Sequence, residues 1–219
     1  MKPFHTGELY QLMHLDRDKS NAALFSACYE STLGKDLRRS AGMHYTSITN
    51  IHKLIDPLFL DELQAEFAAC LTIKTQKKRT AQLLEFQDKL SKLTFLDPAC
   101  GAGNFLTETY LSLRRLENQV IRELHAHQGF LGLTELNPVK VTLDQFYGLE
   151  LNERAVAAAQ NALRLAQCQM MAETSAIIDH PIELEPLQDN ANIVVGNALT
   201  EPWTEVVPAD KLNYIIGNP

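Results

Sequence analysis

Residues 95–106 read Phe-Leu-Asp-Pro-Ala-Cys-Gly-Ala-Gly-Asn-Phe-Leu. A short apolar stretch, Thr94–Asp97, predicts a buried strand, and the two glycines after it predict a tight turn. A long amphipathic helix is expected directly afterwards, from about Asn104 to Leu124. In open α/β sheets, a ligand binds at the carboxyl ends of the strands, over turns of this kind. Gly101 and Gly103 would let it approach the backbone closely.

Three interpretations of this turn are open from the residues alone. One is an ordinary strand-to-helix turn. A second is a dinucleotide site, which needs glycines in the pattern G-x-G-x-x-G. Leu106 stands where the third glycine belongs, and Asp97 would bring a negative charge close to a pyrophosphate. The third interpretation, a site for a cationic ligand, suits an acid at the strand end better.

The remainder of the chain predicts an α/β protein. Strands expected at 141–151, 193–195 and 212–216 alternate with helices, which favours a parallel sheet of about four strands. Helices are expected at 80–92 and 153–170, and a loop at 173–190, where Pro181 and Pro186 lie. Residues 47–70 also predict helix, started by Thr46 or Ser47 and interrupted at Asp56-Pro57, with Asp56 capping a second helix.

The run from Asp97 to Leu106 resembles the cofactor motif of class I S-adenosylmethionine-dependent methyltransferases. It is most similar to the D-P-x-C-G-x-G-x-F form found in amino-group DNA methylases. The resemblance implies a Rossmann-like sheet and a turn that holds the methionine part of S-adenosylmethionine, whose amine and sulfonium are both cationic. The residues implied in this contact are Asp97, Pro98, Ala99, Cys100, Gly101, Gly103, Asn104 and Phe105.

Two further stretches extend the expected cofactor site. Glu150, followed by Leu151, ends the second strand, where an acid can accept both ribose hydroxyls. Asn197-Ala198-Leu199 is similar to the third cofactor motif of the family, in which an aspartate usually accepts from the adenine amino group of the cofactor. The amide oxygen of Asn197 can still accept one such hydrogen bond.

The ends of the matched region resemble two more motifs. Tyr45 and Thr46 match a motif that precedes the cofactor turn in gamma-ordered adenine methylases and closes over the methionine end. Asn218-Pro219 matches the first half of the catalytic motif N-P-P-aromatic. In that family the target base is flipped out of the duplex, and the asparagine side chain and proline carbonyl accept from its amine. A turn that caps a helix is an equally good interpretation of Thr46.

The resemblance therefore implies a DNA adenine-N6 methyltransferase, similar to the methylase portion of large single-chain restriction–modification enzymes. Residues 41–219 would be the N-terminal half of the methyltransferase domain, and residues 1–40 a helical connector. Because the motif stops at Pro219, we expect a fragment that is inactive on its own and dimerises, aggregates or needs a second polypeptide to complete its sheet. The alternatives are a protein glutamine-N5 methyltransferase and an inactive remnant or assembly subunit.

Charge and composition restrict the partners. The net charge is −7, and the segment from Glu150 onward contains ten acidic and three basic residues. The dense basic run, Lys74 to Arg79, is expected to be an exposed loop, so most contacts with double-stranded DNA should lie elsewhere. The four cysteines form no CxxC pair and predict neither a metal site nor disulfides. Without an apolar run of about 20 residues, we expect a cytoplasmic protein with no membrane contact.

Overall fold

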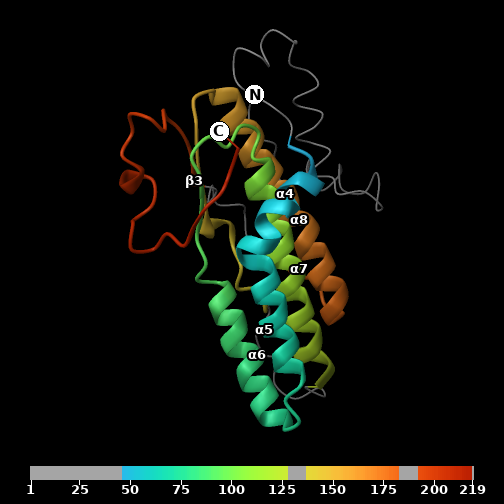
Figure 1. Ribbon diagram of the computed structural model, residues 1–219. Helices are drawn as coiled ribbons and strands as arrows, with labels where there is room; N and C mark the ends of the chain where they lie inside the picture. Colours follow the sequence, from blue (N-terminus) through green and yellow to red (C-terminus); the bar gives the residue numbers. More distant parts are fainter. Residues whose placement is uncertain (1–45, 128–136, 183–191, 219) are drawn as a thin grey trace.

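The computed structural model describes residues 46–127, 137–182 and 192–218, and all statements below concern these residues (Figure 1). The expected helical connector at 1–40 lies outside them, as do two predicted site residues, Tyr45 and Pro219.

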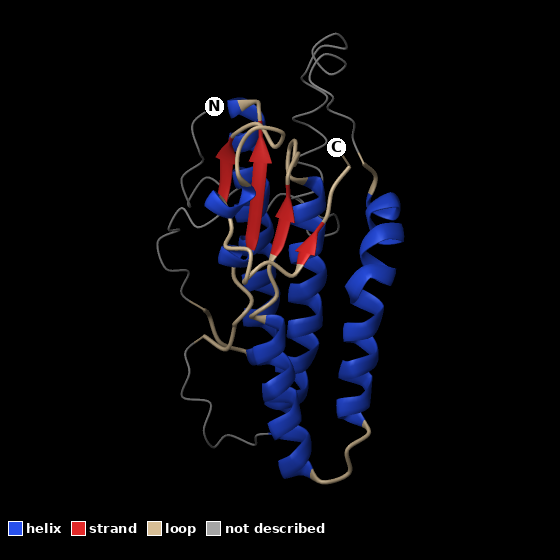
Figure 2. Cartoon of the chain, turned by 60° about the vertical axis from the view of Figure 1, so that its left-hand side comes forward, coloured by secondary structure: helices blue, strands red, loops and turns tan. Residues whose placement is uncertain are grey.

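Four parallel strands form one sheet in the order β3-β2-β1-β4, as Figure 2 shows. They span Phe95–Asp97 (β1), Phe146–Glu150 (β2), Asn192–Val195 (β3) and Tyr214–Ile215 (β4). This confirms the predicted α/β fold with a parallel four-stranded sheet. The second strand is shorter than expected, because a 3₁₀ turn, η2 (Leu143–Gln145), precedes it and is closed by a reciprocal capping pair of Thr142 and Gln145.

An aromatic row fixes the register of three neighbouring strands. Phe95 of β1 lies opposite Phe146 of β2 and Tyr214 of β4. Its ring stacks on both, with centroids 5.5 Å and 5.3 Å away. Cross-strand aromatic pairs of this kind stabilise a sheet beyond the area that they bury. Phe59 and Tyr110, from two helices, pack on the same row and so place it on the helix-covered face.

The helices α7 (Asn104–His127) and α8 (Glu153–Ile178) connect β1 to β2 and β2 to β3. Both connections step in the same direction across the sheet, so right-handed crossovers put both helices on one face, where they pack on each other (Figures 1 and 2). Although both are long, none of the helices in the described part of the chain is apolar enough over a sufficient length to cross a bilayer.

The helix α8 extends beyond the predicted end at Met170, so the loop expected at 173–190 was wrong as far as Ile178. Thr174 explains the extension, because its side chain is fully buried and bonds to Arg114 and Asn118 of α7. The helix ends instead at Asp179, which adopts a left-handed conformation with φ of 52°.

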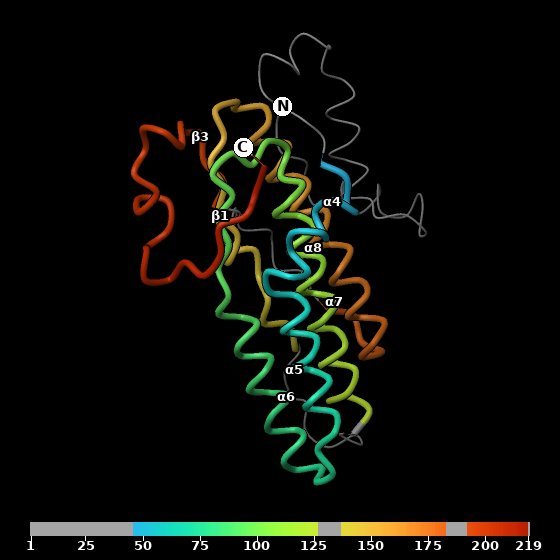
Figure 3. The backbone as a smooth tube through the Cα atoms, in the orientation of Figure 1, coloured from blue at the N-terminus to red at the C-terminus, as the bar shows by residue number. Residues whose placement is uncertain are grey.

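The N-terminal helices form a long hairpin beside α7, as the tube in Figure 3 shows. It consists of α4 (Ile48–Ile55), the π turn η1 (Asp56–Leu60), α5 (Asp61–Leu71) and, after a short turn, α6 (Gln76–Leu90). Ser47 caps α4 as expected, its hydroxyl accepting from Asn50 N–H at 3.4 Å.

The predicted interruption at Asp56-Pro57 was wrong. Asp56 is helical, with its N–H bonded to His52 O, and it caps no new helix. Pro57 has no N–H to donate. The helical turn therefore contains one extra residue, and the Asp61 N–H bonds to Asp56 O. The basic run also differs from the expected loop: Lys77, Lys78 and Arg79 lie in the first turn of α6.

A buried ionic network ties the hairpin to the sheet helices. Glu117 of α7 is fully buried and pairs with Arg114 one turn earlier. Glu117 also accepts hydrogen bonds from Gln87 of α6 at 2.8 Å and from the backbone N–H of Lys140 at 2.6 Å. Arg114 donates in turn to Thr174 of α8 at 2.7 Å. One carboxylate thus connects α6, α7 and the segment that leads into β2, while its arginine partner reaches α8.

Candidate functional site

The carboxyl ends of the four strands carry the polar residues of the candidate site. Asp97 ends β1, Glu150 ends β2, and Asn197 and Asn218 follow β3 and β4 within a few residues. Because all four strands are parallel, these ends share one edge of the sheet. This edge is where α/β sheets bind their ligands.

The turn between β1 and α7 is tied to the neighbouring strand. The N–H of Cys100 donates to Leu149 O of β2 at 2.9 Å, and the Cys100 side chain is buried against Gly148. Gly101 and Gly103 have positive φ angles of 54° and 81°, which other residues rarely adopt.

The two glycines have different surroundings. A Cβ on Gly103 would stand 2.8 Å from the Cβ of Ala159, so Gly103 allows α8 to approach the turn. A Cβ on Gly101 would meet nothing within 4 Å, so Gly101 presents bare backbone to open space.

Glu150 is held by backbone donors. Its Oε2 accepts from Gly101 N–H at 3.0 Å, and its Oε1 accepts from Asn152 N–H at 2.8 Å. A carboxylate offers about four acceptor positions. Glu150 therefore stabilises the turn and keeps capacity to accept hydrogen bonds from a ligand's hydroxyl groups.

Asp97 is a buried acid. Its side chain accepts from Ala99 N–H at 3.1 Å, and the residue is 2% exposed. Burial raises the pKa of Asp97 to about 7, the hydrogen bond from Ala99 opposes this, and the nearby charge of Glu150 adds to it. An ionised carboxylate at this position would gain from a cationic neighbour.

The loop after β3 is held by a hydrogen bond to the side chain of Asn197. Asn197 Oδ1 accepts from Leu199 N–H at 3.0 Å, and Gly196 N–H donates to Glu150 O at 3.0 Å. Trp203, which begins the 3₁₀ turn η3 (Trp203–Glu205), donates from Nε1 to Ala198 O at 2.8 Å. Leu199 itself is 94% exposed.

A histidine in the last turn of α4 contacts the N-terminal part of α7. His52 Nε2 lies 3.1 Å from Glu108 Oε1, and Glu108 lies in the second turn of α7. His52 Nδ1 lies 2.7 Å from Asp56 Oδ1. Burial lowers the pKa of His52, but the hydrogen bonds and charges of the two carboxylates outweigh it, so the pKa is raised. Thr46 lies two residues before α4.

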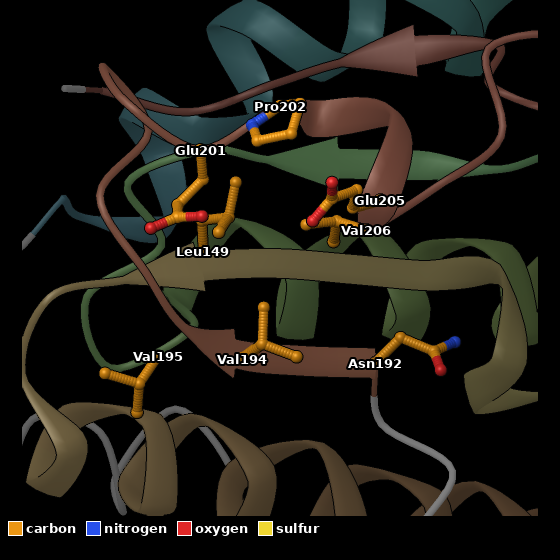
Figure 4. Close-up of a pocket in the computed structure, with 8 residues that line it drawn as sticks. All are labelled: Leu149, Asn192, Val194, Val195, Glu201, Pro202, Glu205 and Val206. Carbon is orange, nitrogen blue, oxygen red and sulfur yellow. The ribbon is translucent and has the colours of Figure 1, made fainter.

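A separate groove of about 390 Å³ lies on the opposite face of the sheet (Figure 4). Val194 points into it towards Pro202 and Glu205, whereas Val195 points away towards a helix. Among the described residues, no predicted cofactor residue lines this groove. The candidate site therefore lies at the carboxyl ends of the strands and not in this groove.

A family model, that of the MmeI DNA-methyltransferase domain, matches residues 73–219, about two thirds of the chain. The chain belongs to this family. The expected resemblance to the methylase portion of restriction–modification enzymes is therefore confirmed.

Two relatives support the membership of this MmeI-family chain. DNA methyltransferase A of Bacillus subtilis (strain 168) is 37% identical over 204 residues, which are 92% of this chain and 22% of the relative. The structure of the type IIL restriction–modification enzyme MmeI in complex with DNA matches with a TM-score of 0.79 and 42% identity. That match covers 90% of this chain and 26% of the MmeI chain. The chain thus spans about a quarter of the length of both.

The MmeI-family fold brings several predicted residues together and leaves others apart. Asp97, Gly101 and Glu150 are joined by hydrogen bonds or by charge around one turn. Phe105, by contrast, is 6% exposed and belongs to the hydrophobic core, and Leu151 and Leu199 are exposed.

Two residues near the site, Asn152 and His52, were not predicted from the sequence. Asn152 donates its N–H to Glu150 and caps α8 with its side chain. Its place just before a predicted helix was the available indication. For His52, which bridges to a residue 56 positions away, the sequence holds no local indication.

Proposed function

We propose that this chain forms the cofactor-binding half of a DNA methyltransferase that transfers a methyl group from S-adenosylmethionine to N6 of adenine. The observation that carries the proposal is the cluster of Asp97, Gly101 and Glu150 at the strand edge, in a chain of the MmeI family. One relative is a DNA methyltransferase by name, and the other is a restriction–modification enzyme whose structure was solved in complex with DNA, which favours DNA over a glutamine side chain as acceptor. A DNA substrate would place the protein in the cytoplasm.

The residues present fit S-adenosylmethionine. The space above Gly101 would accept a ligand in contact with the backbone, because no atom of the described residues beyond its chain neighbours lies within 4 Å of the position a side chain would take. Asp97 supplies a desolvated carboxylate for a cationic group, and Glu150 keeps free acceptor positions for ribose hydroxyls. Asn197 Oδ1 accepts from its own loop and has a second lone pair for an adenine amine.

In the proposed reaction, the cofactor supplies an electrophilic methyl group. The chain's own residues bind and orient. Asp97 would accept from the methionine amine, and Glu150 would fix the ribose. Asn218 and Pro219 would accept hydrogen bonds from N6 of the flipped adenine and so hold its lone pair towards the methyl group. Pro219, like Tyr45, is assigned by resemblance alone and lies outside the described residues.

Glycine substitutions separate the proposed binding role from stability. Gly103→Ala is expected to lower the free energy of unfolding by about 1–3 kcal/mol, because the new methyl group would overlap Ala159. Gly101→Ala shares the strain of a side chain at positive φ but has no such overlap, so it should cost less stability than Gly103→Ala. Its methyl group would occupy the open space, so S-adenosylmethionine affinity should fall at least tenfold. Urea unfolding and calorimetric titration measure the two effects. Equal cofactor affinity in the wild-type and Gly101→Ala chains would contradict the assigned position.

The full reaction is proposed to need further polypeptide. Within the described residues, β4 pairs with β1 alone, and Ile215 is 53% exposed. An unpaired strand edge with an apolar side chain favours the addition of another strand. We therefore propose that a second polypeptide or chain segment completes the sheet and contributes most of the contact with double-stranded DNA.

A chimera tests the proposed activity. The chain would replace the matching residues of the Bacillus DNA methyltransferase A, and the chimera would be incubated with DNA and labelled S-adenosylmethionine. We expect N6-methyladenine in the digested DNA, none from the isolated chain, and a loss of about 100-fold or more in Asn218→Ala. Asn192→Ala, at the opposite strand end, is the matched control. A folded chimera that binds the cofactor and methylates cytosine, or nothing, would contradict the proposal.

A further inference from the structure

We infer that Gly217 is a positioning residue, through which the Asp97 carboxylate sets the place of Asn218. The inference rests on the proposed function, because it assigns Asp97 to the cofactor and Asn218 to the target base. In addition, the position of Asn218 would depend on the position of the Asp97 carboxylate.

The contact between the two residues is close. Gly217 has a φ of 148°, and a Cβ built on it would stand 2.6 Å from Asp97 Oδ1, 3.0 Å from Cγ and 3.3 Å from Oδ2. The whole carboxyl group therefore lies against the Cα of Gly217. Any side chain at this position would displace either the carboxylate or the backbone that leads into Asn218.

Asp97 is the more deeply buried and more firmly anchored of the two partners. It is 2% exposed, ends the central strand β1 and accepts a hydrogen bond from Ala99 N–H. The strand β4, by contrast, contains two residues, and the N–H of Ile216 still donates to Leu96 O at 2.9 Å before the chain turns at Gly217. The backbone at Gly217 thus conforms to the carboxylate, and Asn218 follows directly.

A consequence is that cofactor binding should change the position of Asn218. A cationic group bound to the Asp97 carboxylate would fix its orientation, and with it the surface on which Gly217 rests. The neighbouring Asn218 would then reach its working position only when the cofactor is bound. Glycine is required at position 217 because only a residue without a side chain lets the Asp97 carboxylate contact both the cofactor and the backbone that leads to Asn218.

Hydrogen exchange of the full 219-residue chain tests this inference. In the wild type, S-adenosylmethionine is expected to slow amide exchange in the peptide that contains Ile216, Gly217 and Asn218. In Gly217→Ala the same saturating cofactor should leave exchange in that peptide unchanged. Gly196→Ala is the matched control: its methyl group would crowd Leu149 instead of Asp97, so its cofactor-dependent protection at 216–218 should persist.

A double-mutant cycle tests the contact without any ligand. Gly217→Ala should lower the melting temperature in the wild-type background and lower it by less than half as much in Asp97→Ala, where the overlapping carboxylate is gone. Equal losses in both backgrounds would overturn the inference, as would normal cofactor-dependent protection in Gly217→Ala. If the wild type binds no S-adenosylmethionine, the proposed cofactor is wrong, and non-additive losses in this cycle would still support the contact itself.

Discussion

Replacing Asp97 with asparagine is expected to stabilise the folded chain by about 4 kcal/mol at pH 8 while weakening S-adenosylmethionine binding. Burial raises the pKa of Asp97 to about 7, whereas an aspartate in the unfolded chain ionises near 3.8. A shift of about three pKa units corresponds to about 4 kcal/mol. The native acid is thus destabilising, and the amide, which cannot ionise, removes that cost.

The sign of the pH dependence follows from which state binds more protons. Between about pH 4 and pH 7 the unfolded chain has lost the Asp97 proton and the folded chain retains it. The contribution of Asp97 to stability therefore falls as the pH rises through this window and is constant above it. The gain in Asp97→Asn should be about 4 kcal/mol at pH 8, about 2 kcal/mol at pH 5 and close to zero below pH 4.

Urea unfolding at pH 5 and pH 8 measures this difference. Asp210→Asn, at an exposed acid, serves as the control and should change stability by less than about 0.5 kcal/mol. The same carboxylate predicts that wild-type affinity for S-adenosylmethionine rises about fivefold from pH 6 to pH 7, because the ligand's amine is still protonated there and binds the ionised form of Asp97. A gain that is independent of pH, or an affinity that is flat over this range, would show that Asp97 is not the titrating group.

Replacing Glu117 with alanine is expected to lower the free energy of unfolding by about 3–5 kcal/mol. The substitution leaves Arg114 charged in a site with no exposure, and it removes the acceptor for Gln87 and for the backbone of Lys140. The loss is therefore the cost of an unpaired buried charge and of unsatisfied donors, and not only of one ion pair.

Two comparisons isolate this effect. Glu85→Ala, at an exposed acid of α6, should change stability by less than about 0.5 kcal/mol. The double variant Arg114→Met with Glu117→Leu should lose less than Glu117→Ala, because no buried charge remains in it. Urea unfolding followed by circular dichroism gives all three values, and a double variant that is less stable than the single one would contradict the explanation.

The parts of the fold that depend on local patterns were predictable. The run from Phe95 to Leu106 specifies a buried strand, a glycine turn and a helix within twelve residues, and the structure has all three. The end of α8 was not predictable, because its last two turns depend on Thr174 meeting Arg114, 60 positions earlier. Pro57 was misinterpreted for another reason. A π turn shifts the backbone hydrogen bonding by one residue around the proline, so the helix continues.

The candidate site shows the same division. Asp97 and Glu150 could be proposed because each ends an apolar strand, and a glycine turn follows Asp97 in the sequence. The contact of Gly217 with Asp97 joins residues 120 positions apart, and the bridge from His52 to Glu108 joins two helices. Such contacts follow from the packing of elements, which no local pattern encodes.

The π turn at Asp56–Leu60 has one more consequence, for the spacing of two parts of the surface. It makes a single rod from Ile48 to Leu71, about 35 Å long at roughly 1.5 Å per residue. Near one end His52 contacts Glu108 of α7, and the other end leads to the exposed lysines at the start of α6. The rod therefore holds these lysines away from the start of α4 by about the length of ten base pairs of a duplex, which rises about 3.4 Å per base pair.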